Sequence, residues 1–345
     1  MSNNLITTTQ ELMRCKSVTP ADDGAIDYLI SLLEPMGFTC HKMVMSEEGY
    51  ADITNLYARI GDSGKNFAFA GHTDVVPTGE GWASDPFAAE IRDDVLYGRG
   101  AVDMKAAITC FIDSLKDYLS DNKLKNSFSL IITGDEEAIA VNGTPKIIKW
   151  LEERGEKIDF CIVGEPTSDK KIGDMIKIGR RGSINFDIII HGTQGHVAYP
   201  EKASNPITTL VKILNLLIDY EFDEGNENFS ATNLEVISVD VGNTVTNLIP
   251  ADARAKFNIR FNDEYSSQDI IKLIEYTLEK CSGKYTMNYR VSGESFLSQK
   301  SSYADLVGNA IAEVTGITTE FSTSGGTSDA RFLKSISPIC ELGLR

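Results

Sequence analysis

Residues of metal-binding type follow directly after three apolar segments of this chain. Phe67–Ala70 leads into His72, the segment FSLIIT leads into Glu136 and Glu137, and the segment DFCIV leads into Glu165. Continuous apolar runs of this length are typical of strands buried on both faces, and helix-like segments separate them. Strands that alternate with helices form a mainly parallel sheet flanked by helices, and ligands bind at the carboxyl ends of such strands. The pattern therefore predicts an α/β fold with a site at one edge of its sheet.

Two aspartates extend this predicted site. His72 and Asp74 project to the same side of an extended chain, so the carboxylate of Asp74 is placed to orient the imidazole. Asp103 lies in the segment VLYGRGAVDMK, where a strand ends and a helix begins near Met104. Taken one by one, these features also fit a core histidine paired with an acid, a helix-capping aspartate and a solvated acidic turn. Their repetition at several strand ends favours a metal site.

The predicted donors are one histidine and four carboxylates, which suit one or two divalent metals, zinc first. Two metals can share one carboxylate, lower the pKa of a bridging water and polarise a carbonyl oxygen, so that an amide is hydrolysed at neutral pH. One carboxylate has to stay off the metals as a proton shuttle. The spacing does not decide whether Glu136 or Glu137 takes that role.

The composition limits the partners of the protein. The chain has 345 residues, with 33 Lys and Arg against 50 Asp and Glu, which gives a formal charge of −17. This negative charge argues against nucleic acid and anionic membranes as partners. The six cysteines have no metal-binding spacing, no apolar run approaches the length of a membrane span, and the first residues do not resemble an export signal. We therefore expect a cytoplasmic protein with reduced thiols.

The pattern changes after Lys177. The segment MIKIGRRGSINFDIIIHG predicts a hairpin, and the residues after it predict further antiparallel strands with helices at 206–220 and 267–281. Strand and helix alternate again after Ser292, beginning with a helix at 302–315. We therefore expect a split metal-binding domain, residues 1–177 and 293–345, and an inserted α+β domain at 178–292.

Seven motifs along the chain together resemble those of the co-catalytic zinc amidohydrolases of the aminoacylase and carboxypeptidase type. In chain order they are GHTDVVP, DPF to LYGRGAVDMK, DEE with NGT, VGEPT, GRRGS, GHVAYP and GGTSDARF. The sequence predicts a first helix that begins at Pro20 and ends at Gly37, and the resemblance extends from this helix nearly to the last residue. It implies a zinc-exopeptidase-like α/β domain with an inserted lid through which two subunits form a homodimer.

The resemblance also implies a role for each matched residue. Asp103 bridges two Zn²⁺ ions, for which Co²⁺ is a possible substitute; His72 and Glu165 complete one metal site, and Glu137 belongs to the other. Glu136 is the general base, Asp74 orients His72, and His196 reaches the partner subunit's active site to stabilise the oxyanion. The implied substrate contacts are Arg180, Tyr199, Asn247, Arg260, Gly326, Thr327 and Arg331.

The motifs GRRGS and GHVAYP narrow the implied activity to hydrolysis of N-succinyl-LL-2,6-diaminopimelate, which releases succinate and LL-diaminopimelate for lysine and cell-wall synthesis. Arg180, Arg260 and Arg331 would match the three carboxylates of this small anionic substrate, because a guanidinium binds a carboxylate through two hydrogen bonds. Two alternatives remain open. One is deacetylation of N-acetylornithine, which carries a single carboxylate, and the other is a non-catalytic homologue that binds a small anion.

The motif pattern of the family ends with a histidine just beyond the final strand, and no such residue precedes Arg345. His41 and His191 lie outside the motifs, and His196 has another implied role. We therefore expect that the C-terminal end of a longer chain is missing. We also expect one tightly bound zinc per subunit instead of two, and little activity.

Overall fold

The computed structural model describes residues 3–281, 283–298 and 302–345, and the chain divides into two compact units. The first unit contains Met1–Ile178, Ser298–Ser322 and Ser328–Arg345, and the second contains Gly179–Leu297 and Thr323–Thr327. The first boundary between the units follows Ile178, one residue later than expected, and the second follows Leu297, five residues later than expected. Nothing in the sequence pattern predicted that residues 323–327 would lie with the second unit.

An eight-stranded sheet in the order β1-β2-β6-β3-β7-β18-β8-β17 forms the centre of the first unit. Four neighbouring pairs are parallel, namely β6 with β3, β3 with β7, β7 with β18 and β8 with β17, and the other three pairs are antiparallel. The mainly parallel sheet is thus confirmed. Its strands are β1 (Thr39–Met45), β2 (Ile53–Ile60), β3 (Asn66–His72), β6 (Ser127–Thr133), β7 (Phe160–Val163), β8 (Met175–Lys177), β17 (Glu320–Ser322) and β18 (Ile339–Glu341).

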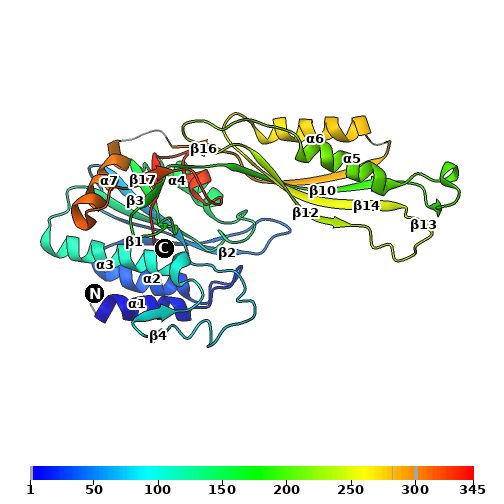
Figure 1. Ribbon diagram of the computed structural model, residues 1–345. Helices are drawn as coiled ribbons and strands as arrows, with labels where there is room; N and C mark the ends of the chain where they lie inside the picture. Colours follow the sequence, from blue (N-terminus) through cyan, green and yellow to red (C-terminus); the bar gives the residue numbers. More distant parts are fainter. Residues whose placement is uncertain (1–2, 282, 299–301) are drawn as a thin grey trace. The chain divides into compact units, whose positions relative to one another are not determined.

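Helices cover both faces of this sheet. On one face α1 (Asn3–Arg14), α2 (Ala25–Leu33) and α3 (Ala106–Asp121) lie side by side (Figure 1), and their apolar side chains form a core with β2, β3 and β6. On the other face α4 (Thr144–Glu153) places its Trp150 ring 5.6 Å from the ring of Tyr57. The unit also contains α7 (Ser302–Thr315) and α8 (Ala330–Leu333). None of the described helices combines the length and the apolar character needed to cross a membrane.

The start of α2 differs from the sequence pattern, which predicts a helix that begins at Pro20. The helix begins only at Ala25, because Gly24 before it has a φ of 82° in the left-handed region. The Asp22 carboxylate accepts the backbone N–H of Ile26 at 3.1 Å and so caps the first turn. The helix α1 was not predicted.

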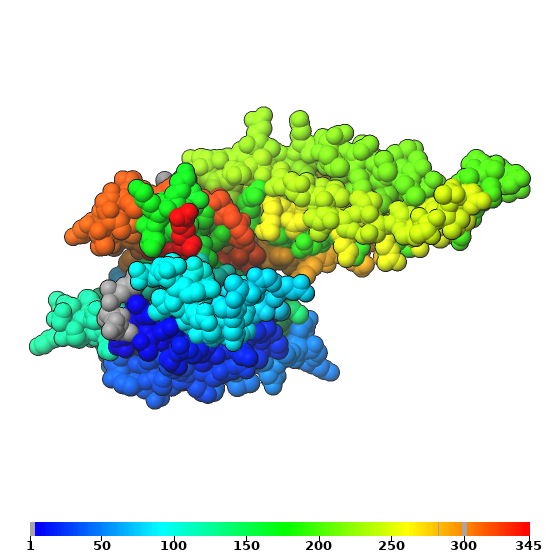
Figure 2. All heavy atoms as spheres, turned by 60° about the horizontal axis from the view of Figure 1, so that its bottom comes forward, coloured from blue at the N-terminus to red at the C-terminus, as the bar shows by residue number. Residues whose placement is uncertain are grey.

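The segment between β3 and α3 lies on the surface of the first unit. It contains a short hairpin of β4 (Glu90–Arg92) and β5 (Val95–Tyr97), whose turn residues Asp93 and Asp94 have φ values of 50° and 61°. Positive φ at both turn positions is the geometry of the tightest hairpins. Gln10 Nε2 of α1 donates a hydrogen bond to the Ala89 carbonyl at 2.7 Å. In Figure 2 this segment, in cyan, accordingly lies beside the blue N-terminal helix.

The second unit is an α+β domain, as predicted. Its antiparallel sheet has the order β12-β14-β10-β15, with β10 (Gly182–His191), β12 (Asn233–Asp240), β14 (Asp252–Phe261) and β15 (Tyr285–Gly293). Both α5 (Pro206–Ile218) and α6 (Ser267–Cys281) lie on one face (Figure 1), where alternate residues such as Ile184, Phe186 and Phe257 form the core. The strand period of two therefore leaves the opposite face of β10 and β14 mainly to polar side chains, with Ile189 as an apolar exception.

The predicted hairpin over MIKIGRRGSINFDIIIHG is wrong. Its first part, β8, pairs with β17 and β18 in the first unit, whereas β10 pairs with β14 and β15 in the second. Between them, β9 (Gly179–Arg180) pairs with β16 (Phe296–Leu297). The two apolar segments are therefore separate strands on either side of the break between units, a distinction that depends on long-range partners and not on local pattern.

Candidate metal centre

Three predicted ligands converge at the carboxyl ends of β3 and β7. His72 is the last residue of β3, Glu165 lies two residues beyond β7, and Asp103 lies in the turn η2 (Ala101–Lys105) before α3. His72 Nε2 is 3.0 Å from Asp103 Oδ1 and 3.6 Å from Glu165 Oε1. One donor atom of each residue lies within 4.8 Å of the other two. The three side chains therefore offer one nitrogen and two carboxylate oxygens to a single metal ion.

Packing around Met104 explains why these distant residues meet. Met104 is fully buried and follows Asp103 directly. A Cβ atom added to Gly71, beside His72, or to Gly164, beside Glu165, would overlap the end of the Met104 side chain. The two glycines thus leave the space into which Met104 packs. This contact holds Asp103 against the ends of both strands.

The hydrogen bond of the imidazole sets its tautomer. His72 Nδ1 lies 2.9 Å from the backbone carbonyl of Asp74, which can only accept, so Nδ1 carries a proton and Nε2 is the nitrogen that faces Asp103 and Glu165 and would bind a metal. The Asp74 carboxylate is farther from Nδ1, at 3.5 Å. Orientation of His72 by Asp74 thus occurs mainly through the backbone, whereas the sequence pattern suggested the side chain.

The Asp74 carboxylate instead holds the acidic pair. Its two oxygens accept the backbone N–H groups of Glu136 at 3.1 Å and Glu137 at 3.0 Å. Both glutamates follow β6, whose last residue Thr133 is in register with His72. The pair is therefore fixed beside the three converging ligands, although Glu137 is not one of the group within 4.8 Å.

Burial raises the pKa of the acids around His72. The pKa of Glu165 is raised to about 8 and that of Glu136 well above its usual value, and the pKa of Glu137 moves in the same direction. Burial alone would lower the pKa of His72, but its interactions with Asp103 and Asp74 and the charge of Glu165 raise it well above the usual value. Among the described residues, the buried Glu165 Oε1 has no hydrogen-bond partner. A divalent cation would complete the contacts of this oxygen and favour the ionised carboxylates, so the donor set fits a metal.

Two further buried carboxylates in the first unit were not predicted. Asp329 is 5% exposed, accepts a hydrogen bond from Thr144 Oγ1 at 2.5 Å, and has a pKa raised to about 6 by burial. Glu341 is 1% exposed, accepts a hydrogen bond from Ser328 Oγ at 2.8 Å, and adds to the effect of burial on Glu165. The available signal for Glu341 was its place at the end of β18, which is parallel to β7.

The predicted substrate contacts Tyr199 and Asn247 and the predicted catalytic residue His196 gather at one end of the second unit. The short strands β11 (Gly195–His196) and β13 (Leu248–Ile249) pair there, and Asn247 Nδ2 lies 3.4 Å from His196 Nε2. The rings of His196 and Tyr199 are 5.9 Å apart, and all three side chains are exposed. Figure 1 shows β13 at the end of this unit that lies away from β16.

Arg180 and Arg260 lie at the other end of the same unit. Arg180 is buried in β9, and its Nη1 donates to the Ser324 carbonyl at 3.1 Å, with Gly325 directly against the guanidinium. Arg260 is near the end of β14, where it pairs with Ser183 at the start of β10. The structure thus divides the substrate contacts implied for the second unit between two ends of its sheet.

The remaining predicted contacts come from the loop before α8. Gly326 and Thr327 belong to the short segment that lies with the second unit. Arg331 belongs to α8 of the first unit, where its guanidinium lies 4.5 Å from the Phe332 ring and its charge opposes the effect of burial on Asp329. These residues follow one another closely along the chain but are divided between the two units.

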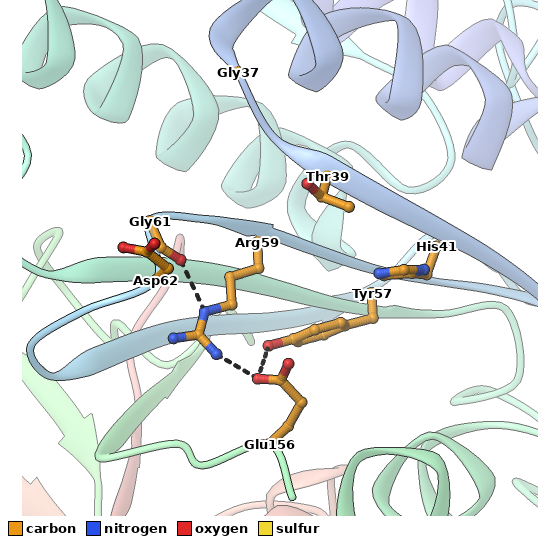
Figure 3. A pocket seen from close by; sticks show the side chains of 8 residues that line it. All are labelled: Gly37, Thr39, His41, Tyr57, Arg59, Gly61, Asp62 and Glu156. Atoms are coloured by element: carbon orange, nitrogen blue, oxygen red, sulfur yellow. Dashed lines mark hydrogen bonds and ion pairs between the residues drawn. The ribbon is translucent and has the colours of Figure 1, made fainter. Parts of the chain in front are cut away.

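The two histidines outside the motifs have other surroundings. His41 stacks on Tyr57 with ring centroids 6.4 Å apart and lines an open cavity of about 600 Å³ (Figure 3). There Glu156 accepts hydrogen bonds from Arg59 and the Tyr57 hydroxyl at 2.5 and 3.2 Å, and no predicted ligand lines the cavity. His191 of the second unit has Nδ1 2.7 Å from Asp252 and Nε2 2.9 Å from Thr286. Neither histidine joins the three converging ligands.

Comparison with known proteins gives concordant matches along the chain. The sequence profile of peptidase family M20/M25/M40 matches residues 68–345. A succinyl-diaminopimelate desuccinylase of Rhodopseudomonas palustris is 50% identical over 343 residues, 97% of this chain and 89% of the relative. One of Rhizorhabdus wittichii is 51% identical over 336 residues, 97% of this chain and 88% of the relative. An M20 family metallo-carboxypeptidase of Sulfolobus solfataricus has a similar fold, with a TM-score of 0.80 at 19% identity over 99% of this chain and 91% of that one.

Proposed function

This chain belongs to peptidase family M20/M25/M40, and from that premise we propose that it hydrolyses N-succinyl-LL-2,6-diaminopimelate to succinate and LL-diaminopimelate. The observation that carries the proposal is the convergence of His72, Asp103 and Glu165 beside the paired Glu136 and Glu137. Relatives at 50 to 51% identity carry the name of this activity. The reaction would supply diaminopimelate for lysine and cell-wall synthesis, in the cytoplasm.

The proposed metals are two Zn²⁺ ions, the first held tightly and the second weakly, with Co²⁺ as a possible substitute. His72, Glu165 and Asp103 would hold the first ion, and Asp103 and Glu137 would contribute to the second. When bound, such ions lower the pKa of a coordinated water and polarise the amide carbonyl. A half-buried carboxyl with a raised pKa is suited to accept a proton from water and return it to the leaving amine nitrogen, so we assign this role to Glu136.

The division of contacts within the second unit supports a homodimer. The β10 strand has 10 residues. At about 3.3 Å per residue its two ends are about 30 Å apart. Arg260 pairs at the start of β10, whereas His196 and Asn247 lie beyond its end. A substrate of this size does not span that distance, so we propose that His196 and Asn247 act in the active site of the partner subunit, where His196 would stabilise the oxyanion.

The activity is tested by comparing succinate release from succinyl-diaminopimelate with acetate release from N-acetylornithine, using metal-loaded protein. The proposal expects kcat/KM for the succinylated substrate to be at least about 10²-fold higher, because several of its carboxylates meet guanidinium groups. Preference for N-acetylornithine would favour the deacetylase alternative. Stoichiometric binding of the succinylated substrate without turnover would favour the non-catalytic alternative.

A further inference from the structure

Arg181 and Arg260 are neighbours in the second unit, because Asn233, to which Arg181 donates, is the register partner of Arg260 on the adjacent strand. No carboxylate is bonded to either guanidinium among the described residues. Arg181 Nη1 donates to the Ala231 carbonyl at 3.0 Å and to Asn233 Oδ1 at 2.9 Å. Arg260 Nε donates to Asn258 Oδ1 at 3.1 Å. All three acceptors are neutral. Within the described parts of the chain, neither guanidinium forms an ion pair with an acid.

The acid whose charge acts on Arg181 is already engaged elsewhere. Asp223 accepts the backbone N–H of Gly225 at 2.7 Å, the backbone N–H of Thr232 at 3.1 Å and the Asn262 amide at 2.6 Å. These bonds hold the Asp223 carboxylate in its own loop. It therefore compensates the Arg181 charge only from a distance.

The electrostatics of the two arginines favour an added anion. Both side chains are half-buried, burial lowers the pKa of each guanidinium, and the charge of Arg181 lowers the pKa of Arg260 further. Two like charges that are partly removed from water raise the free energy of the folded chain, and a bound carboxylate would relieve that cost. The chain as a whole has a net charge of −17, so these two arginines form a local positive region on a negatively charged protein.

The neighbouring side chains hold Arg260 in place. Asn258 Nδ2 donates to Ser183 Oγ at 3.2 Å and to Asn185 Oδ1 at 2.9 Å, which directs Asn258 Oδ1 toward Arg260. The hydrogen bonds that Arg260 makes use only its Nε, so both terminal nitrogens remain for a ligand. A guanidinium fixed in this way is arranged in advance for a two-bond contact with a carboxylate.

The family resemblance already implies that Arg260 contacts the substrate. We propose that Arg181 belongs to the same subsite, where it adds a second guanidinium charge beside Arg260 for one carboxylate of the substrate. Arg260 makes the contact, and Arg181 is a positioning residue that supplies a second fixed charge beside it. The identity of the ligand rests on the proposed function, which offers either the succinyl carboxylate or one of the diaminopimelate carboxylates. The site would add to the preference for a substrate with several carboxylates over N-acetylornithine.

The experiment uses the metal-loaded full chain and two products as separate probes. Binding of succinate and of LL-diaminopimelate is measured by calorimetry at low and high salt, together with kcat and KM. Arg181→Gln keeps side-chain donors but removes the charge, whereas Arg181→Lys keeps the charge. Lys256→Gln is the matched control, because Lys256 is an exposed cation on the same strand and the same face as Arg260.

Arg181→Gln should weaken binding of one of the two products about tenfold at low salt and raise KM by a similar factor, with kcat within about twofold of the parent. Arg181→Lys should recover most of this loss. The difference should shrink at high salt, because ions screen a partly exposed charge. The product that is affected identifies which carboxylate the site binds, and Lys256→Gln should behave as the parent.

Unchanged binding of both products in Arg181→Gln would overturn the proposal. A fall in thermal stability with unchanged KM would also count against it, because it would indicate a purely structural arginine. Arg181-dependent product binding in a protein that releases no succinate would support the site while the proposed function fails. Binding of neither product at millimolar concentration by the parent would contradict the site directly.

Discussion

The carboxylate of Asp74 accepts the backbone N–H of Glu137 at 3.0 Å, although 63 residues separate the two along the chain. Its other oxygen accepts the backbone N–H of Glu136, and its main-chain carbonyl orients His72. Asp74 is fully buried, so these bonds do not compete with water. One residue therefore sets the position of a candidate metal ligand relative to the candidate base.

Asp74→Asn should disturb this arrangement without a change in size. One carboxylate oxygen becomes an NH₂ group that faces a backbone N–H, so one bond is lost and a donor is left buried. We expect a loss of about 1.5 to 3 kcal/mol in the unfolding free energy of the metal-free chain, because hydrogen bonds to charged groups are worth this much. We also expect kcat to fall at least about 10²-fold in the metal-loaded form. Urea unfolding and succinate release measure the two effects; parent-like values in both would contradict the positioning role.

Replacement of Glu136 should remove proton transfer, whereas replacement of Glu137 should remove bound metal. Glu136→Gln should lower kcat at least about 10²-fold while bound metal is kept, because only proton transfer is lost. Glu137→Gln should instead deplete metal, with Asp103→Asn as a second variant of this kind. Metal analysis of each purified variant beside its succinate-release rate separates the two roles. Retained metal in Glu137→Gln and lost metal in Glu136→Gln would reverse the assignment.

Gly164→Ala should weaken the metal centre from inside the core. The added methyl group would overlap Met104 and the Phe69 ring, and overpacking of this kind costs about 1 to 3 kcal/mol. Because Met104 moves with Asp103, zinc affinity should fall together with stability. Gly308→Ala in α7 is the control, since its Cβ would meet Phe321 only at 3.4 Å and alanine favours the helix. A zinc affinity unchanged in Gly164→Ala would argue against the role of this contact.

Asp329 should make the metal-free chain less stable as the pH rises. Its pKa is raised from 3.8 to about 6 in the folded state, so between these values the folded chain holds a proton that the unfolded chain has released. The stability from this proton is present below about pH 4 and lost as the pH rises through about 6. Asp329→Asn should abolish a loss on the order of 2 to 3 kcal/mol between pH 4 and 8. Urea unfolding of chelator-treated protein tests this, with the exposed Asp62→Asn as control; equal pH dependence of Asp329→Asn and the parent would refute it.

The proposed exchange of residues between subunits predicts complementation. His196→Ala and Glu136→Ala should each be inactive, but a mixed dimer contains one site with an intact glutamate from one chain and an intact histidine from the other. Mixing the two proteins under conditions of subunit exchange should therefore restore part of the activity. Exchange is followed independently with two differently tagged chains. Proven exchange without recovered turnover would count against action of His196 in the partner subunit.

The sequence alone determined the order of apolar strands and ligand-type residues in the first unit, because burial on both faces leaves a continuous apolar run. It thereby predicted a mainly parallel sheet and the set His72, Asp103 and Glu165, which the structure brings together. It also predicted the ends of α6 and α7 as they are found. Local spacing was sufficient for the helices and strands because these depend on residues close along the chain, whereas the ligand set followed from the repetition of ligand-type residues at several strand ends.

Only the tertiary structure decided which distant groups meet. The bonds from Asp74 to Glu136 and Glu137 and the packing of Met104 against Gly71 and Gly164 join segments that no local pattern relates. The same holds for the buried Asp329 and for the separation of β8 from β10. In each case the determining energy is a long-range hydrogen bond, a close contact or a loss of solvation, and these depend on the folded neighbours of a residue and not on its neighbours in sequence.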